Sequence, residues 1–195
     1  MFNAASKQIM RVIAGKYRSR QLKTPGYLGI RPTSDRLRET LFNILGPSVE
    51  DSLFIDLYAG TGAIGIEAIS RGAREVFFID RDPDCISLVR QNLESLDIRT
   101  GIEVILADAE SGLEKLAARH LIADFIFFDP PYNDDGYVDL LEYLDASHLI
   151  APQGIVIAEH SSDLELPERL VRLERTRLLE QGDAALSFYR LAAAA

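Results

Sequence analysis

The spacing of apolar and polar positions changes along the chain and separates its first part from its main body. Residues 9–23 alternate around a glycine, which predicts a small hairpin. Residues 33–45 repeat apolar side chains at helical spacing, with Thr33 or Ser34 as a possible cap and Gly46 as a stop. We therefore expect a hairpin and a helix ahead of the main body.

From residue 53 onward, short apolar runs alternate with helical patterns. Strands without a polar face, separated by helices, are typical of a parallel sheet that is covered on both sides. The expected strands are 53–57, 75–80, 102–107, 124–129 and 154–160. The expected helices are 62–70, 83–96, 110–119 and 137–144. The pattern predicts a doubly wound α/β fold.

The end of the chain follows a different pattern. A Gly-Asp turn at residues 182–183 joins two alternating stretches, which predicts an antiparallel hairpin. With 195 residues, of which 47% are hydrophobic, the chain is long enough to bury one substantial core. We expect an extension over residues 1–50 and a main domain over residues 51–195, packed as one unit.

Charge is distributed unevenly along the chain. Residues 1–40 hold nine lysines and arginines against two acids, a net charge of +7, so the remainder of the −9 chain carries −16. A basic segment on an acidic body indicates a polyanion held at one end of the molecule. Some of the arginines can instead pair with Asp35 or Glu39 at helical spacing. The candidate polyanion-binding residues are Arg11, Lys16, Arg18, Arg20, Lys23, Arg31, Arg36 and Arg38.

Several classes of protein are disfavoured. The apolar runs are too short to span a bilayer, and the N-terminus has no apolar stretch of the kind found in secretory signals. The single cysteine, Cys85, cannot form an intramolecular disulfide. The three histidines lie in separate segments without metal-ligand spacing. We expect a cytoplasmic protein that needs no metal.

The first expected strand runs into a glycine-rich loop, D-L-Y-A-G-T-G-A-I-G (56–65). The G-x-G-x-x-G spacing, with Asp80 about twenty residues on, is compatible with NAD. Asp56 and Asp108 favour S-adenosylmethionine instead, because strand-end acids suit an ammonium and an adenine amine but repel a pyrophosphate. The candidate cofactor-binding residues are Asp56, Tyr58, Ala59, Gly60, Gly62, Asp80, Arg81, Asp108 and Ala109.

The fourth expected strand ends on D-P-P-Y (129–132). Asp129 and the Pro130 carbonyl can accept hydrogen bonds from an amine on a nucleobase and orient its lone pair. The prolines stiffen the corner, and Tyr132 can stack on the base. The candidate catalytic residues are Asp129, Pro130, Pro131 and Tyr132. Glu159 or His160, at the end of the fifth strand, could also reach this crevice.

Together with D-L-Y-A-G-T-G, the D-P-P-Y corner resembles class I amino-methyltransferases. Three further segments resemble the RsmD-type 16S rRNA (guanine-N2)-methyltransferases, and the resemblance spans Met10 to about Leu191. These segments are M-R-V-I-A-G-K-Y-R-S-R-Q-L, R-P-T-S-D-R-L-R-E-T-L-F-N-I-L and G-D-A-A-L-S-F-Y-R. The resemblance implies a Rossmann-like sheet of about seven strands with the last one antiparallel, and an N-terminal segment that recognises RNA.

The resemblance also implies a function for the domain at 51–195, which is transfer of a methyl group from S-adenosylmethionine to the N2 amine of a guanine in small-subunit rRNA. The substrate could be naked RNA or an assembling ribosomal subunit, and we expect a monomer. Three alternatives stay open from the residues: an adenine-N6 methyltransferase acting on DNA or RNA, an NAD-dependent oxidoreductase, and a non-catalytic RNA-binding module that would bind RNA without methyl transfer. D-P-P-Y suits guanine and adenine amines equally, whereas the oxidoreductase leaves that corner and the basic segment unexplained.

Overall fold

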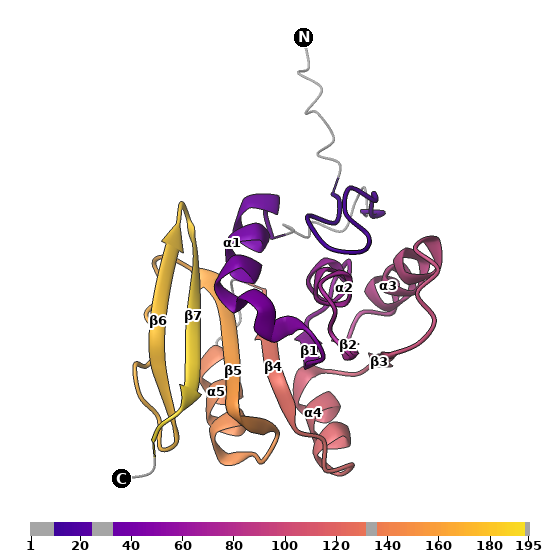
Figure 1. The fold of residues 1–195 in the computed structure, drawn as a ribbon. Helices are drawn as coiled ribbons and strands as arrows, with labels where there is room; N and C mark the ends of the chain where they lie inside the picture. The colour runs from indigo at the N-terminus through magenta and orange to yellow at the C-terminus, as the bar shows by residue number, and fades with distance from the viewer. Residues whose placement is uncertain (1–9, 25–32, 132–135, 194–195) are drawn as a thin grey trace.

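The computed structural model describes residues 10–24, 33–131 and 136–193. Within them, seven strands form one sheet in the order β3-β2-β1-β4-β5-β7-β6 (Figure 1). The strands are β1 (Leu53–Leu57), β2 (Glu75–Asp80), β3 (Ile102–Leu106), β4 (Ala123–Phe128), β5 (Ile150–Ser161), β6 (Leu173–Gln181) and β7 (Ala184–Leu191). Strands β1 to β5 run parallel, and β7 is antiparallel to both of its neighbours, β5 and β6.

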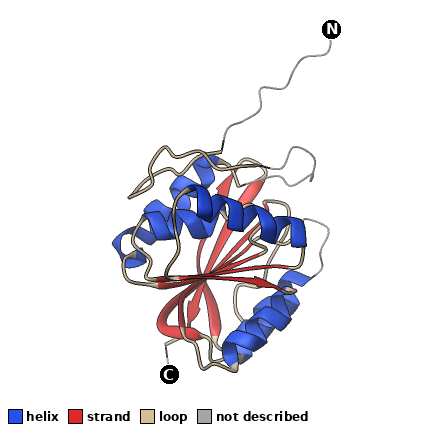
Figure 2. Ribbon diagram, turned by 90° about the vertical axis from the view of Figure 1, so that its right-hand side faces the viewer, coloured by secondary structure: helices blue, strands red, loops and turns tan. Residues whose placement is uncertain are grey.

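Helices lie on both sides of this sheet, as Figure 2 shows with the sheet seen edge-on. They are α1 (Asp35–Leu45), α2 (Ala63–Ser70), α3 (Pro83–Ser95), α4 (Ala109–Ala117) and α5 (Gly136–Ala146), with a short 3-10 turn, η1 (Gly46–Val49), after α1. The core divides accordingly: α1, α2 and α3 pack on one face, and α4 and α5 on the other. All five residues of β1 are buried because both faces are covered.

Local sequence explains where the helices begin. The Ser34 side chain caps α1 by accepting the Leu37 N–H, and Asp82 caps α3 ahead of a proline in the first turn. Asp108 caps α4 in the same way, through the Ser111 N–H. Gly46 follows α1 with a φ of 57°, which accounts for the stop expected there.

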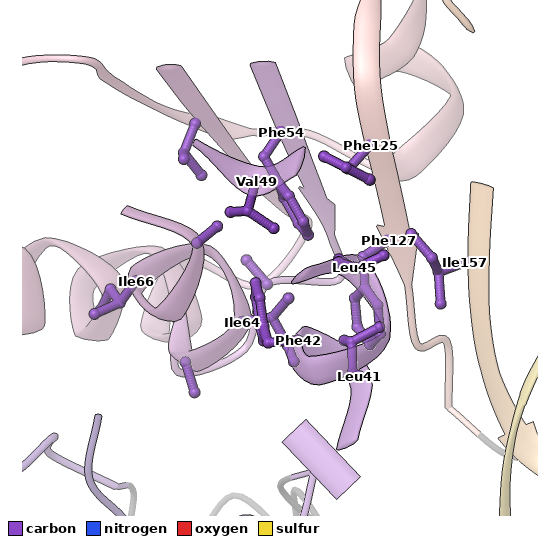
Figure 3. Close-up of a cluster of buried hydrophobic side chains, with 14 of the residues drawn as sticks. Leu41, Phe42, Leu45, Val49, Phe54, Ile64, Ile66, Phe125, Phe127 and Ile157 are labelled. Carbon is purple, nitrogen blue, oxygen red and sulfur yellow. The ribbon is translucent and has the colours of Figure 1, made fainter. Parts of the chain in front are cut away.

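The core beneath α1 joins the N-terminal part of the chain to the sheet (Figure 3). The ring of Phe42 in α1 stacks on that of Phe54 in β1 with centroids 6.1 Å apart, and Phe54 in turn lies 5.8 Å from Phe125 in β4. Met10 and Leu22, from the N-terminal hairpin, belong to the same buried cluster. The described residues before 50 therefore share a hydrophobic core with the sheet.

The N-terminal hairpin lies over α2 (Figure 1), where Glu67 holds it in place. The Glu67 carboxylate is fully buried and accepts the N–H groups of Ile13 at 2.7 Å and Ala14 at 3.0 Å. Gly15 has a φ of +80° and approaches the Ser70 carbonyl so closely that a Cβ would lie 1.8 Å from that oxygen. Glycine is therefore required at this turn by both backbone conformation and space.

The doubly wound fold with an antiparallel strand near the end is confirmed. The predicted N-terminal hairpin contains one antiparallel bridge, between Arg11 and Gln21, rather than two regular strands. The largest error in a boundary concerns β5, which begins at Ile150, four residues before the expected start. The β4–β5 pairing shifts register between Ala123 and Phe125, where β5 accommodates Pro152 and Gly154. No helix in the described part of the chain is long and apolar enough to cross a membrane.

Candidate active site

Four acidic side chains end four adjacent strands of the sheet. Asp80 ends β2, Asp56 lies near the end of β1, Asp129 directly follows β4, and Glu159 lies near the end of β5. Alternation along each strand places all four on the face covered by α1, α2 and α3. The chain changes winding direction between β1 and β4, which is where open α/β sheets bind ligands.

The glycine loop after β1 is held by two of these acids. One Asp56 oxygen accepts the Gly65 N–H at 2.9 Å, and one Asp80 oxygen accepts the Gly60 N–H at 2.8 Å. Tyr58 turns the chain with a φ of 59°, in the region that non-glycine residues seldom adopt. The loop is thus already shaped in the protein alone, with two of its backbone N–H groups directed at carboxylates.

Asp129 is in an unfavourable environment for a charge. Burial raises its pKa to about 8, and the negative charges of Glu159 and Asp56 add to this rise. Burial also holds the pKa of Asp56 well above its usual range, although the bond from Gly65 acts in the opposite direction. None of the described residues around Asp56 and Asp129 in this hollow carries a positive charge. The site therefore favours a cationic ligand.

Tyr137, at the start of α5, fixes the D-P-P-Y corner from the α4–α5 face of the sheet. The Tyr137 hydroxyl is buried and lies within hydrogen-bond distance of two carbonyls, that of Glu159 at 3.0 Å and that of Pro130 at 3.3 Å, which share its proton. Its ring packs on Phe128, the residue before the corner. Pro130 is buried and Pro131 exposed, while the predicted stacking residue Tyr132 lies outside the described residues.

Three hollows adjoin one another along this edge of the sheet, and Tyr58 lines all three. The first contains Asp56 and Asp129, the second contains Asp80 and Asp108, and the third, of about 390 Å³, lies between the N-terminal ends of α4 and α5. Eight of the nine predicted cofactor residues line these hollows: Asp56, Tyr58, Ala59, Gly60, Asp80, Arg81, Asp108 and Ala109. The ninth, Gly62, caps α2 with a φ of 76°.

Asp108 is exposed, and both of its oxygens accept hydrogen bonds from Ser111. The bond from the Ser111 N–H lowers the pKa of Asp108, so this carboxylate is ionised and can accept a further hydrogen bond. It is a helix cap first, and a role toward an adenine amine would be additional.

Six of the eight basic residues predicted to bind a polyanion are exposed. Lys16, Arg18 and Arg36 are exposed. Arg11, Arg20 and Lys23 are exposed and also reach a partner each: the Asp35 carboxylate at 3.7 Å, the Ser95 carbonyl at 2.9 Å and the Gln91 side chain at 3.1 Å, respectively. Arg31 lies outside the described residues.

The prediction for Arg38 is wrong as a surface contact. Its side chain is fully buried in the core, donates to the Arg11 carbonyl at 2.7 Å and pairs with Asp35 at 2.8 Å. The alternative of pairing at helical spacing is therefore the correct one for this arginine. Among the residues that the structure describes, its Nε and Nη1 have no hydrogen-bond partner, and burial lowers its pKa.

Sequence reasoning missed three residues that hold the site together. Tyr137 fixes the corner, Glu67 fixes the hairpin, and Asn92 in α3 joins the hairpin to the glycine loop. The buried Asn92 amide donates to the Thr61 carbonyl at 2.9 Å, and its oxygen accepts the Lys23 N–H at 2.8 Å. The available signal was a polar residue at an inward position of an amphipathic helix, since α3 buries Leu88, Val89, Asn92 and Leu93 on one face.

Glu159 and His160 point to opposite faces of the sheet. The Glu159 carboxylate accepts the Thr33 hydroxyl at 2.7 Å and acts electrostatically on Asp129. His160 instead hydrogen-bonds Ser187 at 2.9 Å on the α4–α5 face. Of the two candidates, Glu159 belongs to the crevice. Over the residues that the structure describes, no cluster of three or more possible metal ligands is present.

The sheet order, the glycine loop and the acid-lined crevice define the protein as one with the Rossmann-like fold of class I methyltransferases. The chain belongs to the family described as conserved hypothetical protein 95, whose model matches residues 10–190. This confirms the RsmD-type family expected from the sequence, because that family includes relatives named as small-subunit rRNA methyltransferases.

Two curated relatives and one solved structure illustrate the similarity. A Bacillus subtilis protein named "Putative rRNA methyltransferase YlbH" is 37% identical, over 93% of this chain and 98% of the relative. The ribosomal RNA small subunit methyltransferase D of Haemophilus influenzae is 30% identical, over 95% of this chain and 94% of the relative. The structure of a Thermus thermophilus hypothetical protein, TTHA0928, has a TM-score of 0.81 and 30% identity, and the match covers 94% of this chain and 100% of that one.

Proposed function

We propose that this protein transfers the methyl group of S-adenosylmethionine to the N2 amine of a guanine in small-subunit (16S) rRNA in the cytoplasm. The observation that carries the proposal is Asp129, a partly buried acid at the topological switch point, beside the Pro130 carbonyl and a glycine loop already tied to acids. The names of the relatives support an rRNA substrate.

The residues of the crevice suit S-adenosylmethionine better than NAD. In a dinucleotide site, backbone N–H groups of the glycine loop and the following helix bind a pyrophosphate. Here the Gly60 and Gly65 N–H groups donate to Asp80 and Asp56, and further negative charge would be repelled. A sulfonium and an ammonium would instead stabilise the ionised forms of Asp129 and Asp56, whose pKa is raised first by burial and then by neighbouring negative charge.

Each part of the cofactor has a candidate partner. Asp80, oriented by the N–H groups of Gly60 and Asp82, would hold the ribose hydroxyls. Asp108 would accept the adenine amine, and Asp56 would attract the ammonium group. When bound, S-adenosylmethionine supplies an electrophilic methyl group.

The D-P-P-Y corner would act on the amine of the base. Asp129 and the Pro130 carbonyl accept its two hydrogens, which turns the nitrogen lone pair toward the methyl group and stabilises the positive charge that develops on nitrogen. The hydrogen bond from the Tyr137 hydroxyl fixes the orientation of the Pro130 carbonyl. The methylated nitrogen then gives one proton to Asp129 or to water, which restores a neutral amine.

The basic hairpin would place the RNA beside this corner. Lys16 and Arg18 are exposed at its turn, and phosphate contacts there would give affinity and orientation rather than base identity. The backbone of the hairpin is bonded to α2 and α3, so an RNA bound to it would have a defined position relative to Asp129.

Labelled methyl transfer tests the proposal. Hypomethylated rRNA and small subunits are incubated with the enzyme and labelled S-adenosylmethionine, the modified nucleotide is mapped, and nucleoside digestion separates N2-methylguanosine from N6-methyladenosine. We expect N2-methylguanosine, and a loss of on the order of 100-fold in turnover for Asp129→Ala with little loss of cofactor affinity. Asp163→Ala, the same change at an exposed position, serves as a matched control. Exclusive formation of N6-methyladenosine would support the adenine alternative instead.

A further inference from the structure

Glu159 lies beside Asp129 at the edge of the crevice. Phe128 of β4 pairs with Ala158 of β5, so the next residue on each strand, Asp129 and Glu159, are also neighbours. Backbones of paired strands lie about 4.8 Å apart, and side chains in register project from the same face. The site therefore contains two carboxylates side by side, of which only Asp129 has a role in the proposed reaction.

The Glu159 side chain is held in a defined orientation. One carboxylate oxygen accepts the Thr33 hydroxyl at 2.7 Å, and the backbone carbonyl of the same residue accepts the Tyr137 hydroxyl at 3.0 Å. The side chain is 4% exposed, which limits competition from water. The bond from Thr33 occupies one of about four lone-pair positions that a carboxylate offers.

Glu159 lies near two ionisable groups on neighbouring elements. Arg38, buried in α1, interacts favourably with its carboxylate. Asp129, directly after β4, is the acid that faces it from the adjoining strand. Each of the two carboxyl groups has an oxygen that can accept a hydrogen bond, so the pair is complementary to a ligand edge that presents two adjacent donors.

We propose that Glu159 selects guanine by accepting the hydrogen on N1, while Asp129 and the Pro130 carbonyl accept those on the N2 amine. Guanine presents N1–H directly beside its amine, whereas adenine presents an unprotonated N1 beside the N6 amine. A carboxylate facing that lone pair would be left unpaired and repelled, which disfavours adenine. This inference rests on the proposed function and assigns its base selectivity to a residue outside the D-P-P-Y corner.

RNA containing 2-aminopurine in place of the target guanine isolates this interaction, because 2-aminopurine keeps the amine but has no hydrogen on N1. Once the target nucleotide is mapped, RNAs with either base are made by ligation and supplied in the form, naked or reconstituted, that the enzyme methylates. For the wild type we expect kcat/KM to be on the order of 100-fold higher with guanine. The affinities of the two RNAs for the cofactor-free enzyme should differ in the same direction.

Glu159→Gln separates recognition of N1 from other differences between the bases, such as the missing O6 of 2-aminopurine. The glutamine amide can donate to an unprotonated N1, so the preference for guanine should fall to within a few fold. Glu174→Gln, the same chemical change at an exposed position of β6, should leave the preference unchanged.

Two results would overturn the assignment. One is equal kcat/KM for the two RNAs with the wild-type enzyme, a measurement that needs no variant to fold. The other is a Glu159→Gln enzyme that loses activity on both RNAs by the same factor, as a purely structural role requires. Failure of the wild type to methylate any guanine-containing RNA would instead refute the proposed function itself.

Discussion

Replacing Asp129 with asparagine should stabilise the free protein at neutral and alkaline pH while it lowers turnover. In the folded chain the pKa of Asp129 rises to about 8 from a usual value of 3.8, first because of burial and then because of the charges of Glu159 and Asp56. Asparagine has nearly the same shape and no charge. The substitution therefore removes the cost of ionising this side chain inside the protein.

The sign and size of the effect follow from proton linkage. Below the unfolded pKa the carboxyl is protonated in both states, and Asp129 carries no ionic cost. As the pH rises from about 4 to about 8, the unfolded state loses the proton and the folded state keeps it, so wild-type stability falls by up to about 1.4 kcal/mol per pH unit. The difference between about 8 and 3.8 corresponds to on the order of 5 kcal/mol at pH 8.

Urea unfolding of the wild type and of Asp129→Asn at pH 5, 6, 7 and 8 measures this difference, because titrating groups away from Asp129 cancel between the two proteins. The stability advantage of Asp129→Asn should grow steadily over this range. Asp163→Asn, at an exposed position, should show no such trend. A difference that stays constant with pH, or a wild type more stable than the variant at pH 8, would refute the reasoning.

Three further outcomes are expected. Tyr137→Phe removes the hydroxyl near the Pro130 and Glu159 carbonyls. It should lower kcat about tenfold with an unchanged cofactor Kd, since preorganised acceptors act mainly in the transition state. An equal loss in cofactor affinity, measured by calorimetry, would contradict this. Affinity for S-adenosylmethionine should rise by up to tenfold per pH unit between pH 6 and 8 as Asp129 ionises, and should rise less steeply for S-adenosylhomocysteine, which lacks the sulfonium charge. Arg18→Ala should reduce the salt dependence of RNA binding by about one unit of slope without changing stability, whereas the buried Arg38→Ala should cost about 3 kcal/mol or more in chemical unfolding.

The sheet could be predicted from sequence because its strands are buried on both faces and therefore read as continuous apolar runs. The same property made the acids visible: Asp56, Asp80 and Asp129 each interrupt or end such a run. A charged residue at that position implies the carboxyl edge of the sheet, where parallel strands bring their ends together. The location of the crevice therefore followed from spacing alone.

The partners of those acids could not be predicted in the same way. That Asp80 accepts the Gly60 N–H and Asp56 the Gly65 N–H depends on how the loop folds back between two strands. Tyr137 contacts the corner only because α5 packs next to it, and no local sequence pattern predicts that packing. Such contacts are set by tertiary geometry and are absent from local sequence.

Arg38 is an instructive failure because the signal was present. The buried positions of α1 include Arg38, Leu41, Phe42 and Leu45, which is the i, i+3, i+4, i+7 spacing of an inward helical face. Counting arginines in the basic segment assigned it to the surface, whereas the periodicity of the helix assigns it to the core. Periodicity was the better guide, because it reports the face on which a side chain must lie.

The N-terminal segment presents basic side chains on its outer surface and is anchored to the protein through its backbone. Its basic residues, such as Lys16 and Arg18, face outward, while its backbone is bonded inward by Glu67 and Asn92. An acidic body can thus carry a basic surface, because Glu67, which anchors the hairpin, binds backbone N–H groups and the neighbouring Arg71 rather than the basic side chains of the hairpin. Asn92 also bonds the Thr61 carbonyl of the glycine loop. Glu67 and Asn92, two buried side chains, would therefore fix the position of a polyanion bound to the hairpin relative to the glycine loop. Neither side chain needs to contact the polyanion.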